Sequence, residues 1–446
     1  MAYQEVKTTG YGTRVKNSFG GIIPSFLLFF AATALLWWNE GRAVKTDKML
    51  NETEKVCVDM ENPSKKDASL DGEVVCASAL ATTEDSLFDK EFNLAEKAIS
   101  LQRRVEYYQW VEHAQSTSED KFGGKEETTT KYTHSREWVS KPINCKSFRD
   151  STFKGKNYVV ANYENKDLWA ENVTFGAYKL NETLTHMIMS REAVVLNLDP
   201  KGLGDIDKSV AAIYAKNTAP QPVPTQPAVT KDSAALAKDS VTVVPDSVPQ
   251  ENKVDLDYVH QAGNVLFLGK DISSPEIGDV RITFEKVVPA TVTIVAQVNG
   301  DTFKAHKHKN GKTFQTLRMG KKDADEIFES EHRANNMWLW VCRILGVILV
   351  IAALKGIFGF LSTLLKVIPF LSNIIGWAVG VVCTVVGIAW SLIVIAVAWL
   401  FYRPLLGIGL LVLAGLLVWI FAFKGKDKLA AMARRGRQNP IPEPGK

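Results

Sequence analysis

The two residues whose types and spacing come nearest to a chemical site are His306 and His308. Side chains two residues apart share one face of an extended segment, so both imidazoles could contact the same metal ion. The sequence offers no third ligand in register and no Cys/His cluster with zinc spacing. We therefore interpret the pair as part of a solvated strand or loop, and we predict no metal site and no cofactor.

Motifs of catalysis are also missing from the sequence. It contains no G-x-S-x-G, Walker A, H-E-x-x-H or G-x-G-x-x-G pattern, and a catalytic Ser, His and Asp would have to converge from scattered positions. We assign no catalytic residue and predict that the protein is not an enzyme. The formal net charge of +4 is small, and the middle of the chain has no basic stripe interleaved with aromatic residues, which argues against nucleic acid as a partner.

The placement of the cysteines leaves one redox question open. Cys57, Cys76 and Cys145 lie in the polar middle of the chain. In an oxidising compartment Cys57 and Cys76 would form the local disulfide and leave Cys145 free, whereas in a reducing compartment all three would be thiols. The sequence is compatible with both states.

Any site in this chain must be positioned by the apolar segments, which lie at its two ends. Residues 19–38 carry no charge, and at ~1.5 Å per residue a helix of this length covers the ~30 Å hydrocarbon core of a bilayer. Trp37 and Trp38 are placed for the aromatic belt at its exit. A cleaved signal peptide, with Ala32-Thr33-Ala34 as cleavage site, fits less well because the apolar run continues past that site.

Three more spans are predicted near the C-terminus, over residues 337–365, 374–400 and 405–423. Arg343 lies inside the first of them, and its long stem is expected to snorkel outward. Four spans return the chain to its starting side, and basic residues flank both ends. The positive-inside rule therefore places both termini in the cytosol and the middle of the chain on the other side.

The middle of the chain has the pattern of a β-rich domain. Apolar residues alternate along 99–111, 280–284 and 292–298, as half-buried strands require. Turn signals occur at Gly123-Gly124, Asn299-Gly300 and Asn310-Gly311, and the last is predicted to join strands at 302–303 and 313–314. Helical patterns cover residues 91–98, 207–215 and 323–334.

The predicted fold class is α+β: a multi-pass membrane protein with one N-terminal and three C-terminal transmembrane helices around a large β-rich extracytosolic domain. The predicted parts are a cytosolic tail (1–18), a transmembrane helix (19–38), the first part of the β-rich domain (39–215), a flexible Pro-, Ala- and Ser-rich insertion (216–253), the second part of the domain with a helix leading to the membrane (254–336), three transmembrane helices (337–365, 374–400 and 405–423) and a basic cytosolic tail (424–446).

Four motifs carry a family resemblance. They are Trp37-Trp38-Asn39-Glu40-Gly41-Arg42-Ala43-Val44, Arg104-Val105-Glu106-Tyr107-Tyr108-Gln109-Trp110-Val111-Glu112, Pro275-Glu276-Ile277-Gly278-Asp279-Val280-Arg281 and Ala398-Trp399-Leu400-Phe401-Tyr402-Arg403-Pro404-Leu405. Together, and in this order, they resemble the LUMA family, transmembrane protein 43. The resemblance covers most of the chain, although the 216–253 insertion and the basic tail depart from the family pattern.

The resemblance implies a non-enzymatic multi-pass protein that organises membrane protein complexes. For an animal protein it implies the endoplasmic reticulum and inner nuclear membrane, with lamins and emerin as partners. For a bacterial relative it implies the inner membrane, where no lamina exists.

The motif residues are interpreted first as structural. Gly41 is expected to end the first helix, and Arg42 is expected to pair with Glu40 or with a lipid phosphate. The full set of motif residues is Trp38, Asn39, Glu40, Gly41, Arg42, Glu106, Tyr107, Gln109, Trp110, Gly278, Asp279, Arg281, Arg403 and Pro404.

Two of these motifs belong to the β-rich domain. Tyr107 and Trp110, with the polar residues around them, are expected to pack in a sheet that is covered on both faces. Gly278 and Asp279 are expected to form a turn that enters a strand, with the Asp279 side chain bonded to nearby backbone.

Two further features concern helix packing and lipid. Gly376, Gly380 and Gly387 lie along one predicted helix and allow close backbone approach, either inside one chain or between copies in a homo-oligomer. A basic cluster after the last span is expected to contact anionic lipid headgroups, unless it serves topology alone. It consists of Lys424, Lys426, Lys428, Arg434, Arg435 and Arg437.

The leading functional hypothesis is a scaffold that presents the β-rich domain to other membrane proteins and self-associates through its helices. The first alternative is a channel or channel subunit formed by oligomerised helices, which requires a polar path among them. The second is a lipid- or envelope-modifying enzyme at the junction between domain and membrane, which requires converging acid, base or nucleophile side chains.

Overall fold

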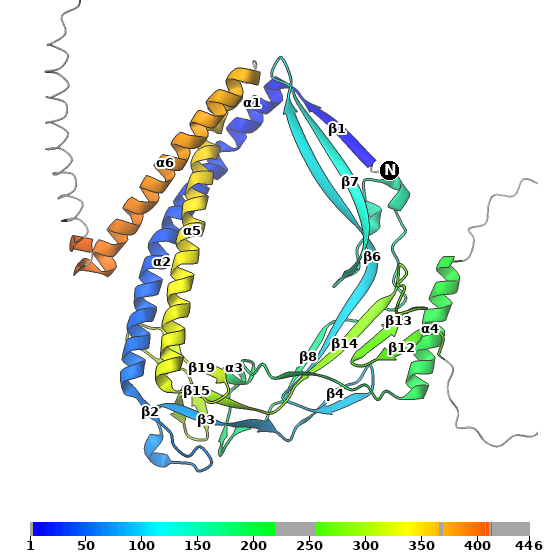
Figure 1. Cartoon of the computed structure of the whole chain (residues 1–446), viewed down its shortest axis with the longest axis vertical. Coiled ribbons are helices and arrows are strands. Elements are labelled where there is room, and N and C mark those ends of the chain that lie inside the picture. The colour runs from blue at the N-terminus through cyan, green and yellow to red at the C-terminus, as the bar shows by residue number, and fades with distance from the viewer. Residues whose placement is uncertain (1–2, 219–255, 365–368, 406, 410–411, 413–446) are drawn as a thin grey trace, which may run out of the picture.

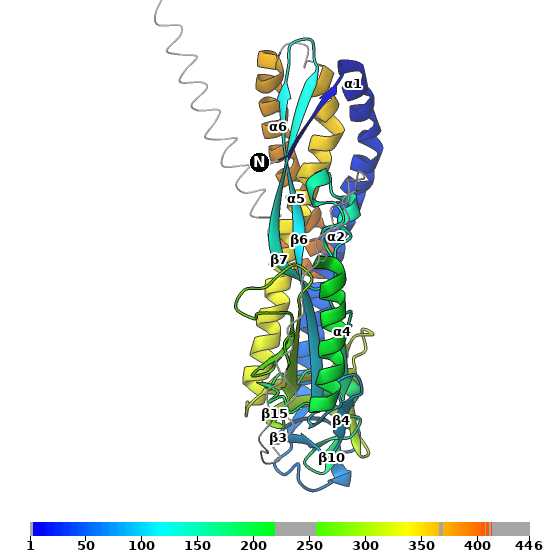
Figure 2. The same ribbon diagram turned by 90° about the vertical axis from the view of Figure 1, so that its right-hand side faces the viewer.

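The computed structural model describes residues 3–218, 256–364, 369–405, 407–409 and 412. These residues form an elongated frame, in which long helices make one side and β-structure makes the base and the opposite side (Figure 1). Turned by 90°, the frame is narrow, with the helices and the long strands one behind the other (Figure 2).

Four helices make the helical side of the frame. They are α1 (Tyr11–Gly20), α2 (Ile22–Val56), α5 (Ala324–Leu364) and α6 (Pro369–Tyr402). Within the described residues, three helical stretches are long and apolar enough to cross a membrane: 11–56, 324–360 and 377–402. The predicted span 19–38 lies within the first stretch, and the predicted spans 337–365 and 374–400 overlap the second and third. The predicted fourth span, 405–423, and the basic tail lie almost wholly outside the described residues.

The helices do not stop at the predicted membrane boundary. α2 continues 18 residues past Trp38, to Val56, and α5 begins at Ala324, well before the predicted span at Met337. The predicted helix 323–334 and the second span are therefore one unbroken helix. Both helices reach the β-rich domain without a hinge.

The larger sheet has the strand order β1-β7-β6-β14-β13-β12, with β11 paired to β14 and β8 paired to β6. Its strands are β1 (Tyr3–Thr9), β6 (Ser100–Asp120), β7 (Glu126–Val139), β8 (Lys166–Trp169), β11 (Arg191–Ala193), β12 (Val259–Ala262), β13 (Val265–Leu268) and β14 (Val280–Val287). Helix α4 (Pro200–Thr218) packs beside β12 and contains the predicted helix 207–215. The predicted insertion 216–253 lies outside the described residues beyond Thr218.

The second sheet has the order β19-β15-β16-β10-β9-β3-β2 and lies at the base of the helices (Figure 1). Its strands are β2 (Cys57–Asp59), β3 (Val74–Thr83), β9 (Val173–Phe175), β10 (Tyr178–Lys179), β15 (Ala290–Asn299), β16 (Thr302–Lys304) and β19 (Thr316–Met319). Buried apolar residues of both sheets form one core, which includes Ile282 and Phe284 of β14 and Ile294 of β15. The short helix α3 (Glu182–Thr185) completes this part.

Two local predictions are wrong. Residues 91–98, predicted as helix, instead enter the small hairpin of β4 (Ser86–Asp89) and β5 (Leu94–Lys97), because Phe92 and Leu94 are buried in the common core. The Asn310-Gly311 turn does join a hairpin, β17 (His306–Lys307) with β18 (Thr313–Phe314), but the partner strand is not the predicted 302–303. The turns at Gly123-Gly124 and Asn299-Gly300 are confirmed by positive φ at Gly123, Gly124 and Gly300.

The N-terminal segment, predicted only as a polar tail, forms β1 and α1. All seven residues of β1 pair with β7 near the tip of the long β6–β7 hairpin. Arg14 of α1 is buried against that tip, where it donates to the Gly124 carbonyl oxygen at 3.0 Å and to the Asp120 carboxylate at 2.6 Å. The hairpin therefore meets the helical side at α1, at one end of the frame, and from there runs down the opposite side toward the base (Figure 1).

Candidate functional site

Glu40 of α2 is the centre of the most buried polar cluster on the helical side. It is 2% exposed, and Arg343 of α5 donates to both of its carboxylate oxygens, from Nε at 2.6 Å and from Nη2 at 2.9 Å. Trp399 of α6 donates from its indole nitrogen to the same carboxylate at 2.8 Å. We call Glu40, Arg343 and Trp399 the interface clamp, because these three side chains join three helices.

Aromatic rings complete the surroundings of the Arg343 guanidinium. It lies 4.9 Å from the ring centroid of Trp340 and 5.3 Å from that of Trp399. A guanidinium over indole faces is stabilised by the ring quadrupole, and the planar fork fits a carboxylate bidentately. The expectation that Arg343 snorkels outward is therefore wrong: its side chain is buried and neutralised inside the protein.

A second layer of hydrogen bonds continues the clamp toward the β-rich domain. Asn39 donates to the Leu339 carbonyl oxygen at 3.0 Å, and Asn335 donates to the Ala43 carbonyl oxygen at 3.0 Å. Arg42 donates to the side-chain oxygens of both asparagines. The prediction that Arg42 pairs with Glu40 is therefore wrong, because Arg343 holds the Glu40 carboxylate.

Gly41 has a packing role in place of the expected helix end. It is buried in the middle of α2, and a Cβ added there would lie 2.6 Å from the Tyr402 ring of α6. Only glycine allows this close approach. After Tyr402, α6 ends, and the Arg403 amide donates to the Trp399 carbonyl oxygen at 2.7 Å before Pro404 begins the next turn. The fourth motif thus contacts the first.

Tryptophans mark the level of the clamp relative to a bilayer. Trp38, Trp338 and Trp340 are each more than half exposed and lie beside it in sequence. Tryptophan is enriched at the membrane–water interface, where the ring is apolar and the N–H is wet. The exposed tryptophans therefore support a membrane–water interface at the level of the clamp and its asparagine layer.

The other two motifs meet in the larger sheet. Glu106 of β6 and Arg281 of β14 are register partners, and Arg281 donates to the Glu106 carboxylate at 2.6 and 2.8 Å while lying over the Trp138 ring. Gln109 is 1% exposed and bridges the Ile143 amide and the Tyr158 carbonyl oxygen. These contacts match the packing role expected for this motif.

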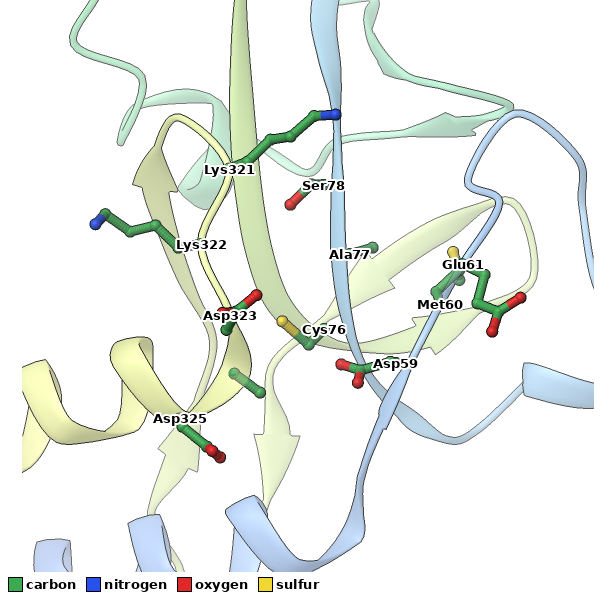
Figure 3. A pocket seen from close by; sticks show the side chains of 11 residues that line it. Asp59, Met60, Glu61, Cys76, Ala77, Ser78, Lys321, Lys322, Asp323 and Asp325 are labelled. Atoms are coloured by element: carbon green, nitrogen blue, oxygen red, sulfur yellow. The ribbon is translucent and has the colours of Figure 1, made fainter.

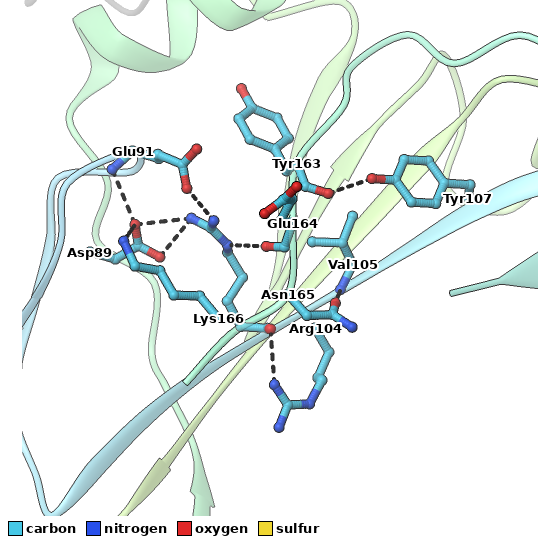
Figure 4. Close-up of polar contacts among 10 residues, drawn as sticks. Asp89, Glu91, Arg104, Val105, Tyr107, Tyr163, Glu164, Asn165 and Lys166 are labelled. Carbon is cyan, nitrogen blue, oxygen red and sulfur yellow. Dashed lines mark hydrogen bonds and ion pairs between the residues drawn. The ribbon is translucent and has the colours of Figure 1, made fainter. Parts of the chain in front are cut away.

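Tyr107 and Trp110 are held by the loop that follows β7. Tyr107 is buried, and its hydroxyl donates to the Tyr163 carbonyl oxygen (Figure 4). Trp110 packs edge-on against Phe153. In the same region the buried Arg103 guanidinium donates hydrogen bonds to the buried Asp89 carboxylate and to the half-exposed Glu91 carboxylate (Figure 4).

Asp279 is the most enclosed carboxyl group of the domain, with no exposed surface. It accepts hydrogen bonds from the Tyr214 hydroxyl of α4 and from the Glu276 amide, the latter at 2.8 Å, so the expected bond to nearby backbone is present. Burial raises the pKa of Asp279 to about 7, against the lowering effect of the Glu276 amide. Gly278 has φ +105°, and a Cβ added there would lie 2.4 Å from the Tyr158 ring, so a residue with a side chain does not fit at this position.

The cleft at the base of α2 and α5 lies in the β-rich domain, far along both helices from the clamp, and is a place where an enzyme could hold its chemistry. It has a volume of about 390 Å³, and its lining includes Asp59, Glu61, Cys76, Ser78 and Asp323 (Figure 3). Burial raises the pKa of the Cys76 thiol to about 11, so the thiolate is disfavoured. The Ser78 hydroxyl is bonded to Thr293, and the lining contains no histidine. This lining offers no activated nucleophile.

The remaining predicted features are placed as follows. Cys57 and Cys76 are free thiols in adjacent strands, so the disulfide does not form in this structure, and Cys145 is free and buried. His308 is bonded to Glu52, and no group of metal-binding side chains occurs among the described residues. Gly387 lies against Ile351 of α5, whereas Gly380 has open space around it. Gly376 lies in α6, and the side chains around it are not described.

Sequence reasoning missed Arg343 and Trp399 as partners of Glu40. The sequence did contain a signal: Glu40 directly follows the apolar segment 19–38, and Arg343 lies one to two turns inside the segment 337–365. An acid and a base at a similar depth in two membrane segments are candidates for an ion pair. Spacing along the chain could not reveal it, since Glu40 and Trp399 are 359 residues apart.

Comparisons with a family model and with individual proteins all point to the same family. The family model described as transmembrane protein 43 matches residues 107–404. The chain is 25% identical over 406 residues to mouse transmembrane protein 43, covering 89% of this chain and 88% of that protein, and 26% identical over 416 residues to the human protein, covering 90% of each. A fruit-fly homolog is 22% identical over 397 residues, covering 87% of this chain and 90% of that protein. No solved structure matches significantly. The chain therefore belongs to the transmembrane protein 43 family.

Proposed function

We propose that the protein is a non-enzymatic membrane scaffold, which holds a β-rich domain at a fixed orientation to the bilayer so that other membrane proteins can assemble on it. The observation that carries this proposal is the continuity of α2 and α5, which pass from the apolar segments into the domain without interruption. A protein that only tethers its domain to the membrane would not need continuous helices, whereas a scaffold must hold its binding surface at a fixed position.

The interface clamp supports the same conclusion. Breaking a buried ion pair by removing one partner costs about 3–5 kcal/mol, so Glu40 and Arg343 resist sliding of α2 against α5. Asn39 and Asn335 fix the register of the two helices one turn further out. The domain and the membrane helices thus move as one body.

We further propose that both termini face the cytosol and that the β-rich domain lies on the opposite side. The basic residues before α2 and the basic tail 424–446 support this orientation through the positive-inside rule. Self-association through the open face at Gly380, and contact of the tail with anionic lipids, are part of the same proposal.

Separation of native membrane complexes by size tests the scaffold role. Membranes from cells with the gene, without it, and with the Glu40→Gln variant are solubilised mildly, resolved by blue native electrophoresis and quantified by mass spectrometry. A scaffold predicts that at least one membrane protein complex shifts to lower mass without the protein, and that wild type restores it while Glu40→Gln restores it poorly. Identical complex profiles in all three membranes would contradict the proposal.

A further inference from the structure

Three basic side chains gather where α2 leaves the apolar layer. Arg42 and Lys45 lie on α2, four and seven residues past Trp38, and Lys312 approaches them from the turn between β17 and β18. At ~1.5 Å per residue, Arg42 lies ~6 Å beyond the tryptophan belt, which is the depth of lipid headgroups. We call Arg42, Lys45 and Lys312 the cation cluster.

Side-chain hydrogen bonds fasten the turn that carries Lys312 to α2, and His308 of the same turn is bonded to the Glu52 carboxylate of α2. Lys312 donates from Nζ to the Thr46 hydroxyl at 2.6 Å, and the Asn310 side chain donates to the Lys45 carbonyl oxygen at 2.8 Å. Arg42 is bonded only to amide oxygens of Asn39 and Asn335 among the described residues. These bonds fix the turn and the side chains of Arg42 and Lys312 without a counter-charge, whereas Lys45 is exposed and takes part only through its backbone carbonyl oxygen.

The acids close to the cluster are occupied elsewhere. Asp47 and Glu52 of α2 pair with His332 and His308, and Glu331, which shares a cavity with Lys312, accepts a hydrogen bond from Arg318 at 2.6 Å. Within the described chain, none of the three cations forms an ion pair with a carboxylate. The cluster is therefore short of negative charge.

The electrostatic effect is visible at Lys312. Its pKa is lowered, first by partial burial and then by the charges of Arg42 and Lys45. Repulsion among the partly buried Arg42 and Lys312 and the exposed Lys45 beside them opposes folding, and an anion that joins them removes this cost. Guanidinium and ammonium groups on a surface at headgroup depth are the usual partners of a phosphate.

We propose that the cation cluster is a binding site for the phosphate group of an anionic phospholipid, on the leaflet next to the β-rich domain. The lipid bridges α2 and the β17–β18 turn, and it neutralises the repulsion between the three side chains. The site is distinct from the basic tail 424–446, which lies beyond the last predicted span. It does not depend on the scaffold role, because the contacts that build it lie within one chain.

The test uses the full chain purified in a neutral detergent and titrated with short-chain lipids. Dioctanoyl phosphatidylglycerol, dioctanoyl phosphatidylcholine and inorganic phosphate are compared as probes by their effect on the melting temperature. At about 100 times its dissociation constant, phosphatidylglycerol is expected to raise the melting temperature by roughly 3 °C. Phosphatidylcholine and inorganic phosphate are expected to have little effect.

Variants assign the effect to the cluster. Residue 45 holds the turn only through its backbone carbonyl oxygen, so the Lys45→Gln variant is expected to fold normally. This variant is expected to bind phosphatidylglycerol about fivefold more weakly, because each cation near an anionic headgroup contributes about this factor to the affinity. Lys45→Gln/Lys312→Gln is expected to bind about 25-fold more weakly. Lys201→Gln/Lys208→Gln on α4, at the opposite side of the frame (Figure 1), removes the same charge and is expected to bind like wild type.

The outcomes separate the possible ligands. Weaker binding in the cluster variants together with normal binding in the α4 control supports the proposal. If inorganic phosphate raised the melting temperature as much as phosphatidylglycerol does, the ligand would be free phosphate and not a lipid. Equal binding by Lys45→Gln, Lys45→Gln/Lys312→Gln and wild type would overturn the site itself.

Discussion

Arg343 and Glu40 face each other across α5 and α2, 303 residues apart, and form a bidentate ion pair at the point where both helices leave the apolar layer. A single charge at this position would be unstable in either helix. Together, and with the Trp399 indole as a third donor, the two charges lock the helices in one register.

The first prediction concerns this pair. Glu40→Gln leaves the Arg343 guanidinium buried without a counter-charge, so the protein is expected to lose about 3–5 kcal/mol of stability. The double variant Glu40→Gln/Arg343→Met removes both charges and is expected to recover most of that loss. Thermal unfolding in one detergent, followed by circular dichroism, measures both effects.

Arg333→Gln is the matched control for this experiment. Arg333 pairs with Glu329 on the same helix, but the two side chains are 75% and 71% exposed, so this change is expected to alter stability very little. A double variant as unstable as Glu40→Gln would contradict the ion-pair explanation.

The second prediction is a pH dependence at Asp279. Burial raises the pKa of this carboxyl to about 7, above the value near 3.9 of an unfolded chain. The folded state therefore binds the proton more tightly, and its stabilising effect is present at low pH and is lost as pH rises through about 7. Relative to Asp279→Asn, the wild type is expected to lose about 3 kcal/mol between pH 5 and pH 8.

Melting curves of both proteins over that pH range measure the difference. Asp205→Asn, at an exposed position on α4, provides the control and is expected to follow the wild-type profile. Parallel profiles for wild type and Asp279→Asn would show that Asp279 does not titrate in this range.

The third prediction separates two roles of the glycines in α6. A Cβ at position 387 would lie 2.7 Å from the Ile351 side chain, so Gly387→Leu is expected to lower the melting temperature by disturbing the contact of α6 with α5. Position 380 is open within the chain, so Gly380→Leu is expected to keep the melting temperature and to shift the particle mass downward. Light scattering in nanodiscs, corrected for lipid, measures the mass. An unchanged mass for Gly380→Leu would remove this face as an oligomer interface.

Much of the helical side could be predicted from the sequence, because a run of about 20 uncharged residues has few alternatives to a membrane helix. The hairpin turns could also be predicted, because the signal lies in two adjacent residues: Asn-Gly and Gly-Gly favour positive φ. The clamp was not predictable in this way: Gly41 looks like a helix end until the Tyr402 ring is seen against it, and Arg343 looks solvated until Glu40 is placed beside it. Both roles depend on contacts between residues about 300 or more positions apart.

The same limit explains the missed strand β5. Residues 91–98 favour a helix locally, but Phe92 and Leu94 gain more free energy by entering the core than about two exposed turns of helix would provide. For Asp279 the sequence indicated a turn, and the structure added the Tyr214 hydroxyl from α4, which no local pattern contains.

The last prediction concerns β1. Its pairing with β7 places the hairpin tip beside α1, at the far end of the apolar helices from the domain. In a bilayer crossed by α2, the polar hairpin would have to pass through hydrocarbon, where each charged side chain costs about 2.5–3.5 kcal/mol. The hairpin carries many such residues, among them Glu119, Lys121, Lys125 and Glu127. A ladder of seven residue pairs contributes only on the order of 5–10 kcal/mol.

The cost of placing these charged side chains in hydrocarbon exceeds the free energy that the β1–β7 ladder contributes. We therefore expect β1 and β7 to pair in detergent and to separate when α2 spans a membrane. Val6 and Thr129 are register partners, and Val6→Cys/Thr129→Cys is expected to form an oxidative crosslink in detergent but not in sealed membranes. Ser116→Cys/Thr130→Cys joins register partners within the β6–β7 hairpin and is expected to crosslink in both. A Val6–Thr129 crosslink in sealed membranes would place β1 and the β-rich domain on one side, and would rule out α2 as a membrane-crossing helix.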